Sequence, residues 1–180
     1  MTDYINFLKD FPDRCLKIWK QEQAKDKEVT LSLMVASAGF VISFERLKSS
    51  EINPTDSKKF KELREEKFLK SELHPKKNAE WLLGEYYPKK GDLDQCDDLN
   101  NKKKIKDHIT VGDVLNLIRN ALAHGAIHTR ANPEKRIELI VFVSGSSETK
   151  KNFIGVAPEE FSLFLENWFN FLKKLDLTKT

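Results

Sequence analysis

The chain contains few cysteines and has little net charge of either sign. Its 180 residues include only two cysteines, Cys15 and Cys96, which lie far apart and form no C-x-x-C pair. This spacing argues against a disulfide framework or a cysteine zinc site and suits a reducing cytoplasm. One third of the residues are charged (33%), but the formal net charge is only +3. Charge alone therefore does not indicate a nucleic-acid-binding protein.

The sequence also lacks a secretory signal and a long apolar run. No apolar core segment follows the first residues, as a signal peptide would require. The longest uncharged run, Val29–Phe44, contains several serine and threonine residues and is shorter than the ~20 residues of a membrane helix. We expect this run to be a buried helix of a cytoplasmic protein that contacts no membrane. Residues 1–180 are long enough for one domain with a sizeable core.

Apolar periodicity predicts a mainly helical fold. Apolar residues recur at helical spacing in segments at about 12–24, 28–48, 57–72, 79–86, 110–125 and 158–175. The stripe of the last helix, from Phe161 to Leu175, is continuous enough to be core or a dimer surface. Gly39, in the middle of the second helix, costs about 1 kcal/mol relative to alanine, so a neighbouring helix should approach closely there.

A β-hairpin is expected between the last two long helices. Residues 136–143 are rich in β-branched and apolar side chains, a Ser-Gly-Ser-Ser turn follows, and residues 152–156 can form the returning strand. Residues at about 88–108 are rich in Lys, Asp and Asn and predict an exposed loop. The predicted fold class is a mainly α, up-and-down helical bundle with one small β-hairpin.

The helix predicted at 110–125 has clear ends. Thr110 can cap its first turn, with Asp113 three residues on in a variant of the capping box. Gly125 is a stop signal just past the last periodic residues. The apolar positions of this helix form one stripe, made of Val111, Leu115, Ile118 and Leu122.

The opposite face of this helix carries a row of polar residues. With ~100° of rotation per residue, the row consists of Asp113, Asn116, Asn120 and His124. Arg119 lies on its flank. Asn, Asp and His form helices less readily than the Lys and Glu that fill other exposed positions. A functional role would explain these poor helix formers. The alternative is a face open to solvent, whose final His interacts favourably with the helix dipole.

The end of this helix resembles the signature of the HEPN superfamily. The signature is an Arg, usually a polar residue after it, and a His four to six positions after the Arg; Arg119, Asn120 and His124 match it. Members include RNA-cleaving toxins, phage-defence effectors and the nuclease domains of some CRISPR effectors. The resemblance implies a HEPN-like helical bundle, RNA as substrate, and a homodimer whose composite cleft is built from both motifs.

In a toxin–antitoxin system, an antitoxin protein would be a further partner. HEPN toxins that are paired with a nucleotidyltransferase antitoxin often carry a Tyr two residues after the motif His. Ala126 occupies that position here. Control through modification of that Tyr is therefore not supported.

The three motif residues suit RNA cleavage without a metal or a cofactor. The 2′-hydroxyl can attack the adjacent phosphate if a base accepts its proton, an acid protonates the leaving oxygen and a cation stabilises charge at phosphorus. His124 suits either proton transfer, and Arg119 offers a charged fork for phosphate oxygens. Asn120 can add a hydrogen bond or hold the imidazole ring. Because one chain supplies one such set, two copies around a two-fold axis would complete it.

Several alternatives stay open at this point. His124 and His128 have a metal-ligand spacing, but Gly125 should break the helix between them and no carboxylate lies between them. Glu45 and Arg46 are either partners that support the motif or an ordinary solvated pair. The main rival function is a non-catalytic HEPN-like module that binds a protein or a nucleotide. Such a module would not need the complete Arg-Asn-x-x-x-His set.

Basic residues on both sides of the motif helix are candidate RNA contacts. Those after the helix are close enough in sequence for local phosphate contacts and comprise Arg130, Lys135 and Arg136. Those before it comprise Lys102, Lys103 and Lys104. The second group lies roughly 20 Å from the motif, given the rise per residue of a helix. It could follow a longer RNA backbone, although a solvated loop is the default interpretation.

Overall fold

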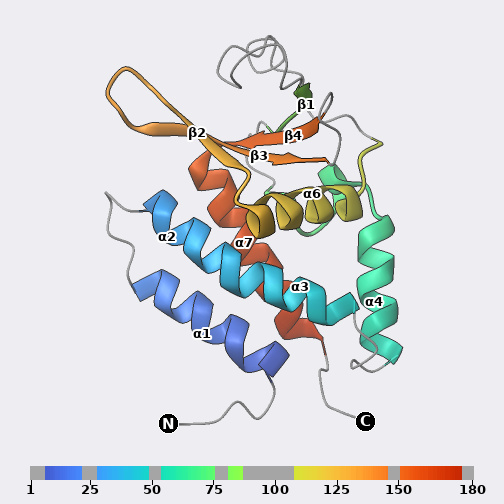
Figure 1. The fold of residues 1–180 in the computed structure, drawn as a ribbon. Helices are drawn as coiled ribbons and strands as arrows, with labels where there is room; N and C mark the ends of the chain where they lie inside the picture. Colours follow the sequence, from blue (N-terminus) through green and yellow to red (C-terminus); the bar gives the residue numbers. More distant parts are fainter. Residues whose placement is uncertain are drawn as a thin grey trace.

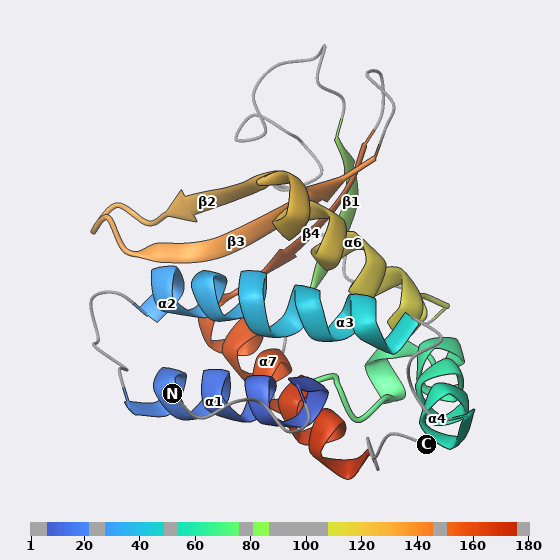
Figure 2. The same cartoon turned by 60° about the horizontal axis from the view of Figure 1, so that its bottom comes forward.

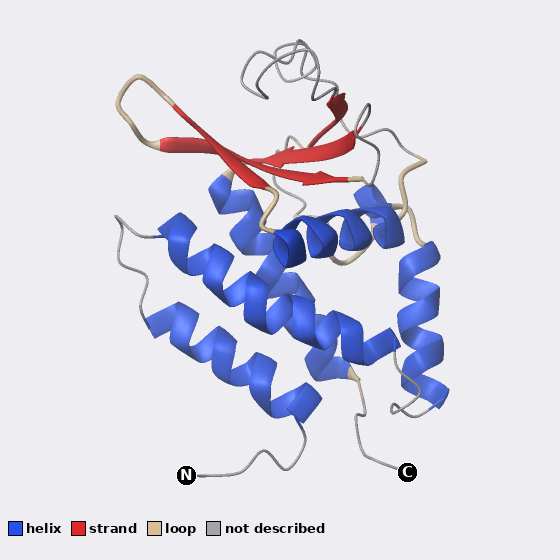
Figure 3. Cartoon of the chain, viewed as in Figure 1, coloured by secondary structure: helices blue, strands red, loops and turns tan. Residues whose placement is uncertain are grey.

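The helices of the protein lie on one side of a four-stranded antiparallel sheet (Figures 1 and 3). The structure is a computed structural model that describes residues 7–21, 28–48, 54–75, 81–86, 108–145 and 151–175. Below the sheet come α6, then the helix formed by residues 28–48, then α1, in both views of the fold (Figures 1 and 2). The mainly helical prediction is confirmed, but the sheet is larger than the predicted small hairpin.

Most helices lie close to the predicted positions, but α1 begins at Phe7, earlier than the start predicted at about residue 12. The helices are α1 (Phe7–Gln21), α2 (Glu28–Val35), η1 (Ala36–Phe40), α3 (Val41–Lys48), α4 (Pro54–Glu65), η2 (Phe68–Lys70), α6 (Val111–His124) and α7 (Pro158–Lys174). The helix predicted at 57–72 ends earlier, at Glu65, because the chain then turns to pair with the start of α6. Phe68 N–H donates to the carbonyl of Ile109 at 2.9 Å, and Lys67 and Thr110 form a β-bridge.

The sheet contains two strands that were not expected. In spatial order it is β1-β4-β3-β2, and its strands are β1 (Leu82–Tyr86), β2 (Ile127–Ala131), β3 (Ile137–Ser144) and β4 (Lys151–Val156). The predicted hairpin is confirmed as β3 and β4. The prediction of a short helix at 79–86 is wrong. Residues 82–86 form strand β1, which pairs along β4 with Leu83 opposite Ile154. Pairing with a distant strand overrides the local preference of so short a segment. Apart from His108, the loop predicted at about 88–108 lies outside the described residues.

Aromatic side chains join α7 to the other helices. Trp168 lies in the centre, with its ring centroid 5.1 Å from that of Phe40 and 6.2 Å from that of Phe60. Its indole N–H donates to Ser43 Oγ at 3.1 Å, so the polar atom of this buried residue is paired. The whole predicted stripe of α7 is buried and is therefore core, namely Phe161, Phe164, Leu165, Trp168, Phe171, Leu172 and Leu175.

α2, η1 and α3 run as one continuous rod between α1 and α6 (Figure 2). The middle of the rod, η1, is a π-helical segment and contains Gly39. A Cβ atom at Gly39 would lie 2.8 Å from Phe169 Cζ of α7 and 3.3 Å from Cys15 Cβ of α1. The close helix approach predicted from this glycine is thereby confirmed.

The two faces of the rod differ. One face packs against α1, α6 and α7, whereas Met34 and Ile42 on the other face are 64% and 38% exposed. The part from Val29 to Lys48 has 20 residues and a mean hydropathy of 1.4, enough by length and composition to cross a membrane. A core helix of a soluble protein meets the same criterion, so this finding does not assign a membrane span.

Replacing Gly39 with alanine should destabilise the fold. Phe169 is fully buried, so its ring has little room to move away from a new methyl group. We expect overpacking to outweigh the gain in helix propensity and to lower the free energy of unfolding by about 1–2 kcal/mol. Urea denaturation would measure this change. In a Phe169→Leu background the ring is gone, so the same substitution should cost less; an equal cost in both backgrounds would contradict the proposed clash.

Candidate functional site

α6 has the caps that the sequence predicts. Asp113 N–H donates to Thr110 Oγ1 at 3.1 Å, and Thr110 N–H donates to Asp113 Oδ2 at 3.0 Å, which completes a capping box. Gly125 ends the helix with φ 65°, in the left-handed region that favours glycine. Both ends of α6 are thus fixed by local hydrogen bonds and backbone geometry.

Burial of the apolar stripe determines which way the rest of α6 faces. The stripe residues are at most 8% exposed, and they are Val111, Leu115, Ile118 and Leu122. Because a helix turns ~100° per residue, Asn120 and His124 point away from this contact. Asn120 is half-buried and His124 is exposed.

Arg119 is held between two oxygen atoms. Its Nη1 donates to Asn120 Oδ1 at 2.8 Å, and its Nε lies 2.8 Å from Oε1 of Glu45 on α3. The Nε–H bond does not point at this oxygen, so the contact is an ion pair and not a well-aligned hydrogen bond. Of the two sequence-based interpretations of Glu45, the structure supports the one in which it contacts the motif. Lys48 lies 3.7 Å from the same oxygen.

His124 occupies the last position of α6. Within the described part of the chain, no hydrogen bond or ion pair engages its imidazole ring. Both ring nitrogens of this exposed side chain are therefore accessible to a bound molecule. Arg119, Asn120 and His124 thus present a held cation, an amide and an exposed imidazole in the last two turns of a single helix.

The predicted RNA contacts after α6 are scattered and partly neutralised. Arg130 on β2 forms an ion pair with Glu138 at 3.1 Å, and Arg136 lies 3.9 Å from Glu134. Lys135, in the turn between β2 and β3, is exposed and has φ 62°. The structure does not gather these residues around the motif. The other candidates lie outside the described residues, namely Lys102, Lys103 and Lys104.

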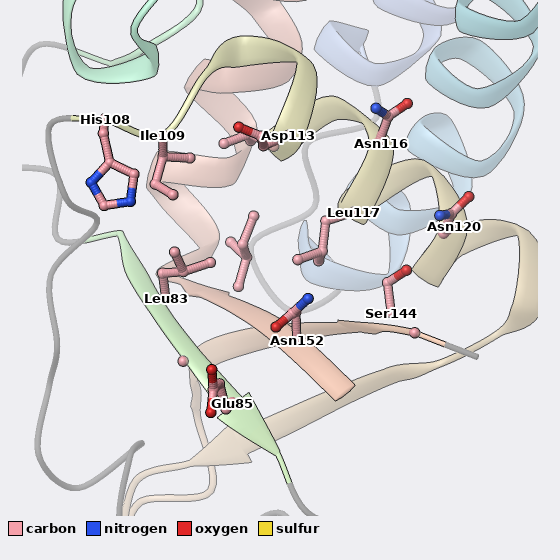
Figure 4. A pocket seen from close by; sticks show the side chains of 14 residues that line it. Leu83, Glu85, His108, Ile109, Asp113, Asn116, Leu117, Asn120, Ser144 and Asn152 are labelled. Atoms are coloured by element: carbon pink, nitrogen blue, oxygen red, sulfur yellow. The ribbon is translucent and has the colours of Figure 1, made fainter. Parts of the chain in front are cut away.

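A pocket that the sequence did not predict opens beside the motif. It has a volume of about 590 Å³ and lies between α6, β1, β4 and the end of β3 (Figure 4). Asn120 belongs to its wall, together with Asp113 and Asn116 of the same polar row. Most of the other wall residues come from the strands, so no local pattern in the sequence could reveal this hollow.

Among the residues that the structure describes, three titratable groups have shifted pKa values, and all three lie away from α6. Burial lowers the pKa of His74, whose ring packs edge-on against Phe68 with centroids 5.2 Å apart. Burial raises the pKa of the Cys15 thiol. Hydrogen bonds from Lys17 and Lys173 lower the pKa of Asp13. The Asp13 contacts join α1 to α7, so these shifts reflect packing of the helical layer.

The described residues contain no group of three or more His, Cys, Asp or Glu side chains that could hold a metal ion. His128 lies on β2, beyond the end of α6 at Gly125. His124 and His128 are therefore not on one helix, which removes the helical spacing that suggested a shared metal.

Comparison with known proteins identifies a family for this chain. The model of the family described as HEPN pEK499 p136 matches residues 1–178. No match was found among curated proteins or among solved structures. The match spans nearly the whole chain, including the motif helix and the core around it. The chain therefore belongs to the HEPN pEK499 p136 family and, with it, to the HEPN superfamily.

Proposed function

We propose that the protein is a metal-independent RNA endonuclease of the HEPN type. The observation that carries this proposal is the placement of Arg119, Asn120 and His124 in the last two turns of a doubly capped helix. Glu45 and Asn120 orient the guanidinium group, while the imidazole stays accessible. We further propose that the protein acts in the cytoplasm as a toxin or a phage-defence effector. If it is a toxin, an antitoxin protein would be its partner.

The proposed reaction uses the 2′-hydroxyl of the RNA as nucleophile. One His124 accepts the hydroxyl proton as the bond from the 2′-oxygen to phosphorus forms. The bond from phosphorus to the 5′-oxygen breaks, and a second protonated imidazole supplies the proton for that oxygen. Arg119 stabilises the negative charge that develops on the phosphate oxygens. The products carry a 2′,3′-cyclic phosphate and a 5′-hydroxyl.

The reaction needs two proton-transfer groups, so we propose a symmetric homodimer. The exposed face of the rod lies beside α6 and is connected to the motif through Glu45. It is mostly apolar, a composition suited to a contact with a second copy, and consists of Thr30, Leu33, Met34, Ser37, Ala38 and Ile42. A contact between two such faces would bring the C-terminal ends of two α6 helices together. Repulsion between the two Arg119 side chains is tolerable there because a phosphate is expected between them.

The rival function is a non-catalytic module that binds a protein or a nucleotide. The pocket beside Asn120 is the observation that favours it, because a pocket can bind a ligand without any reaction. A binding module would not explain why His124 is accessible, or why Glu45 and Asn120 hold Arg119. The two functions are separated by whether RNA is cut.

Substitution of either motif residue should abolish cleavage of RNA. We expect His124→Ala to lower kcat by about 10²–10⁴-fold, the usual contribution of a proton-transfer group. Arg119→Ala should lower it by about 10²–10³-fold, because the charge on the phosphate oxygens is no longer stabilised. Circular dichroism should show an unchanged fold, since neither residue belongs to the buried stripe. His128→Ala is the matched control and should keep full activity. Cleavage at the parent rate by His124→Ala would rule out the catalytic assignment.

The same assay tests the chemistry of the cut. Activity should persist in excess EDTA, and RNA with 2′-O-methyl groups should resist cleavage because its nucleophile is blocked. Mass spectrometry should find 2′,3′-cyclic phosphate ends. Loss of activity on chelation with recovery on addition of zinc, together with loss in His128→Ala, would favour a metal site instead.

Glu45→Gln should reduce cleavage without unfolding the protein. Glutamine keeps the shape of the side chain but removes the charge that positions the Arg119 guanidinium. Because small displacements of a catalytic group are costly, we expect kcat to fall by about 10–100-fold with little change in KM. The matched control is Glu138→Gln, which removes the partner of Arg130 on β2. Equal effects of the two substitutions would argue against a specific positioning role for Glu45.

The dimer should depend on the exposed face of the rod. Met34→Glu and Ile42→Glu place a charge within the proposed contact, and light scattering should then report a monomer that no longer cuts RNA. Ile18→Glu is the matched control, because Ile18 is also exposed (53%) but lies on α1. A parent protein that is monomeric and still cleaves RNA would contradict the composite site.

A further inference from the structure

The pocket beside α6 has the size and walls of a site for a small flat molecule. Its volume of about 590 Å³ lies within the range of about 300–1,000 Å³ that ligand sites usually have. Leu83 of β1 and Leu117 of α6 are half-buried and stand on facing sides of its centre (Figure 4). Val114 and Ile154 add buried apolar surface. A planar ring would contact apolar groups on both of its faces.

Polar groups surround this apolar centre. His108 stands at one end, and Asn120 and Ser144 stand at the other (Figure 4). The capping box uses Oδ2 of Asp113, which leaves Oδ1 as an acceptor. Asn120 accepts from Arg119 through its Oδ1, so its Nδ2 is the atom that can donate to a ligand. Asn116, also in the wall, carries both a donor and an acceptor.

The charge of the wall favours a base over a phosphate. Among the described residues that line the pocket, the ionisable ones are Glu85, His108 and Asp113, and none is Lys or Arg. Asp113 is exposed, and its carboxylate repels a phosphate group and accepts hydrogen bonds from N–H donors. A nucleobase combines two apolar faces with an edge of such donors and acceptors, and proteins read the bases of unpaired RNA through that edge.

We infer that this pocket binds a nucleobase of the RNA next to the cut, and that guanine fits it best. Guanine presents two adjacent donors, N1–H and the N2 amino group, which Oδ1 of Asp113 and the amide oxygen of Asn116 can accept together. Asn120 links the two sites, because its Oδ1 holds Arg119 while its side chain lines the pocket. A base in the pocket would thus place its phosphate beside the motif. The role in cleavage rests on the proposed function, whereas binding of the base does not.

Binding of free nucleosides tests the pocket without any reaction. Calorimetric titration of the full chain should show guanosine binding about tenfold more tightly than inosine, which lacks the N2 amino group, or uridine. GTP should bind no more tightly than guanosine, since the described residues of the wall include no Lys or Arg for its phosphates. Equal binding of all three nucleosides, no binding at all, or much tighter binding of GTP would overturn the inference.

Two substitutions test whether this pocket is the site of binding. Leu83→Trp should fill it and abolish guanosine binding, and Asn116→Ala should weaken binding about tenfold while favouring the helix. Matched controls on the exposed face of α7, Leu163→Trp and Asn170→Ala, should change nothing. Guanosine binding that survives Leu83→Trp in a folded protein would place the site elsewhere and overturn the inference.

Mapping the cuts in an RNA of random sequence separates this inference from the proposed function. Cuts should lie next to guanines, and Asn116→Ala should lose that preference while still cutting RNA. Cleavage without a base preference, in a protein that does not bind guanosine, would contradict the pocket and leave the nuclease standing. Guanosine binding that depends on Leu83 and Asn116 in a protein that cuts no RNA would support the pocket and contradict the nuclease.

Discussion

The burial of one face of α6 between the sheet and the helical rod controls the geometry of the site. Val114, Leu115 and Ile118 are fully buried, and burial of each such side chain stabilises the fold by about 1.5–3 kcal/mol. With this face held and both ends capped, the helix cannot rotate about its axis without exposing its apolar stripe. The directions of Arg119, Asn120 and His124 follow from the period of the helix. The site therefore depends on packing that involves none of its own residues.

The ion pair between Arg119 and Glu45 has a different role from that packing. Both side chains are partly open to solvent, with exposed fractions of 29% and 41%. Ion pairs at such positions contribute about 0–1 kcal/mol to stability, far less than the apolar contacts of α6. The pair between Arg119 and Glu45 therefore adds little to the stability of the fold. It does fix the direction of the long Arg119 side chain, which would otherwise sample many rotamers. A carboxylate from another helix thus sets where the positive charge of the motif points.

The sequence predicted features that local patterns determine. The caps and stripe of α6, the core face of α7 and the tight approach at Gly39 follow from a few neighbouring residues. β1 did not follow, because this five-residue strand takes its form from β4, which lies far along the chain. β2 pairs with the neighbouring β3 and was missed because its sequence, Ile-His-Thr-Arg-Ala, is mostly polar and contains no apolar run. The Glu45 contact could be named only as one of two alternatives, since nothing local specifies which helix lies beside α6. The pocket was missed for the same reason, because its walls come from several separate segments.

The edge strand β2 carries features that oppose uncontrolled association. As the outer strand of the sheet it leaves one row of backbone groups without a neighbouring strand. Its register shifts between Arg130 and Ala131, and His128 and Thr129 are exposed on it. A bulge and polar side chains at an edge hinder the addition of a further strand, which is the first step toward fibrillar aggregates. These features protect the sheet against growth from molecule to molecule along its β2 edge.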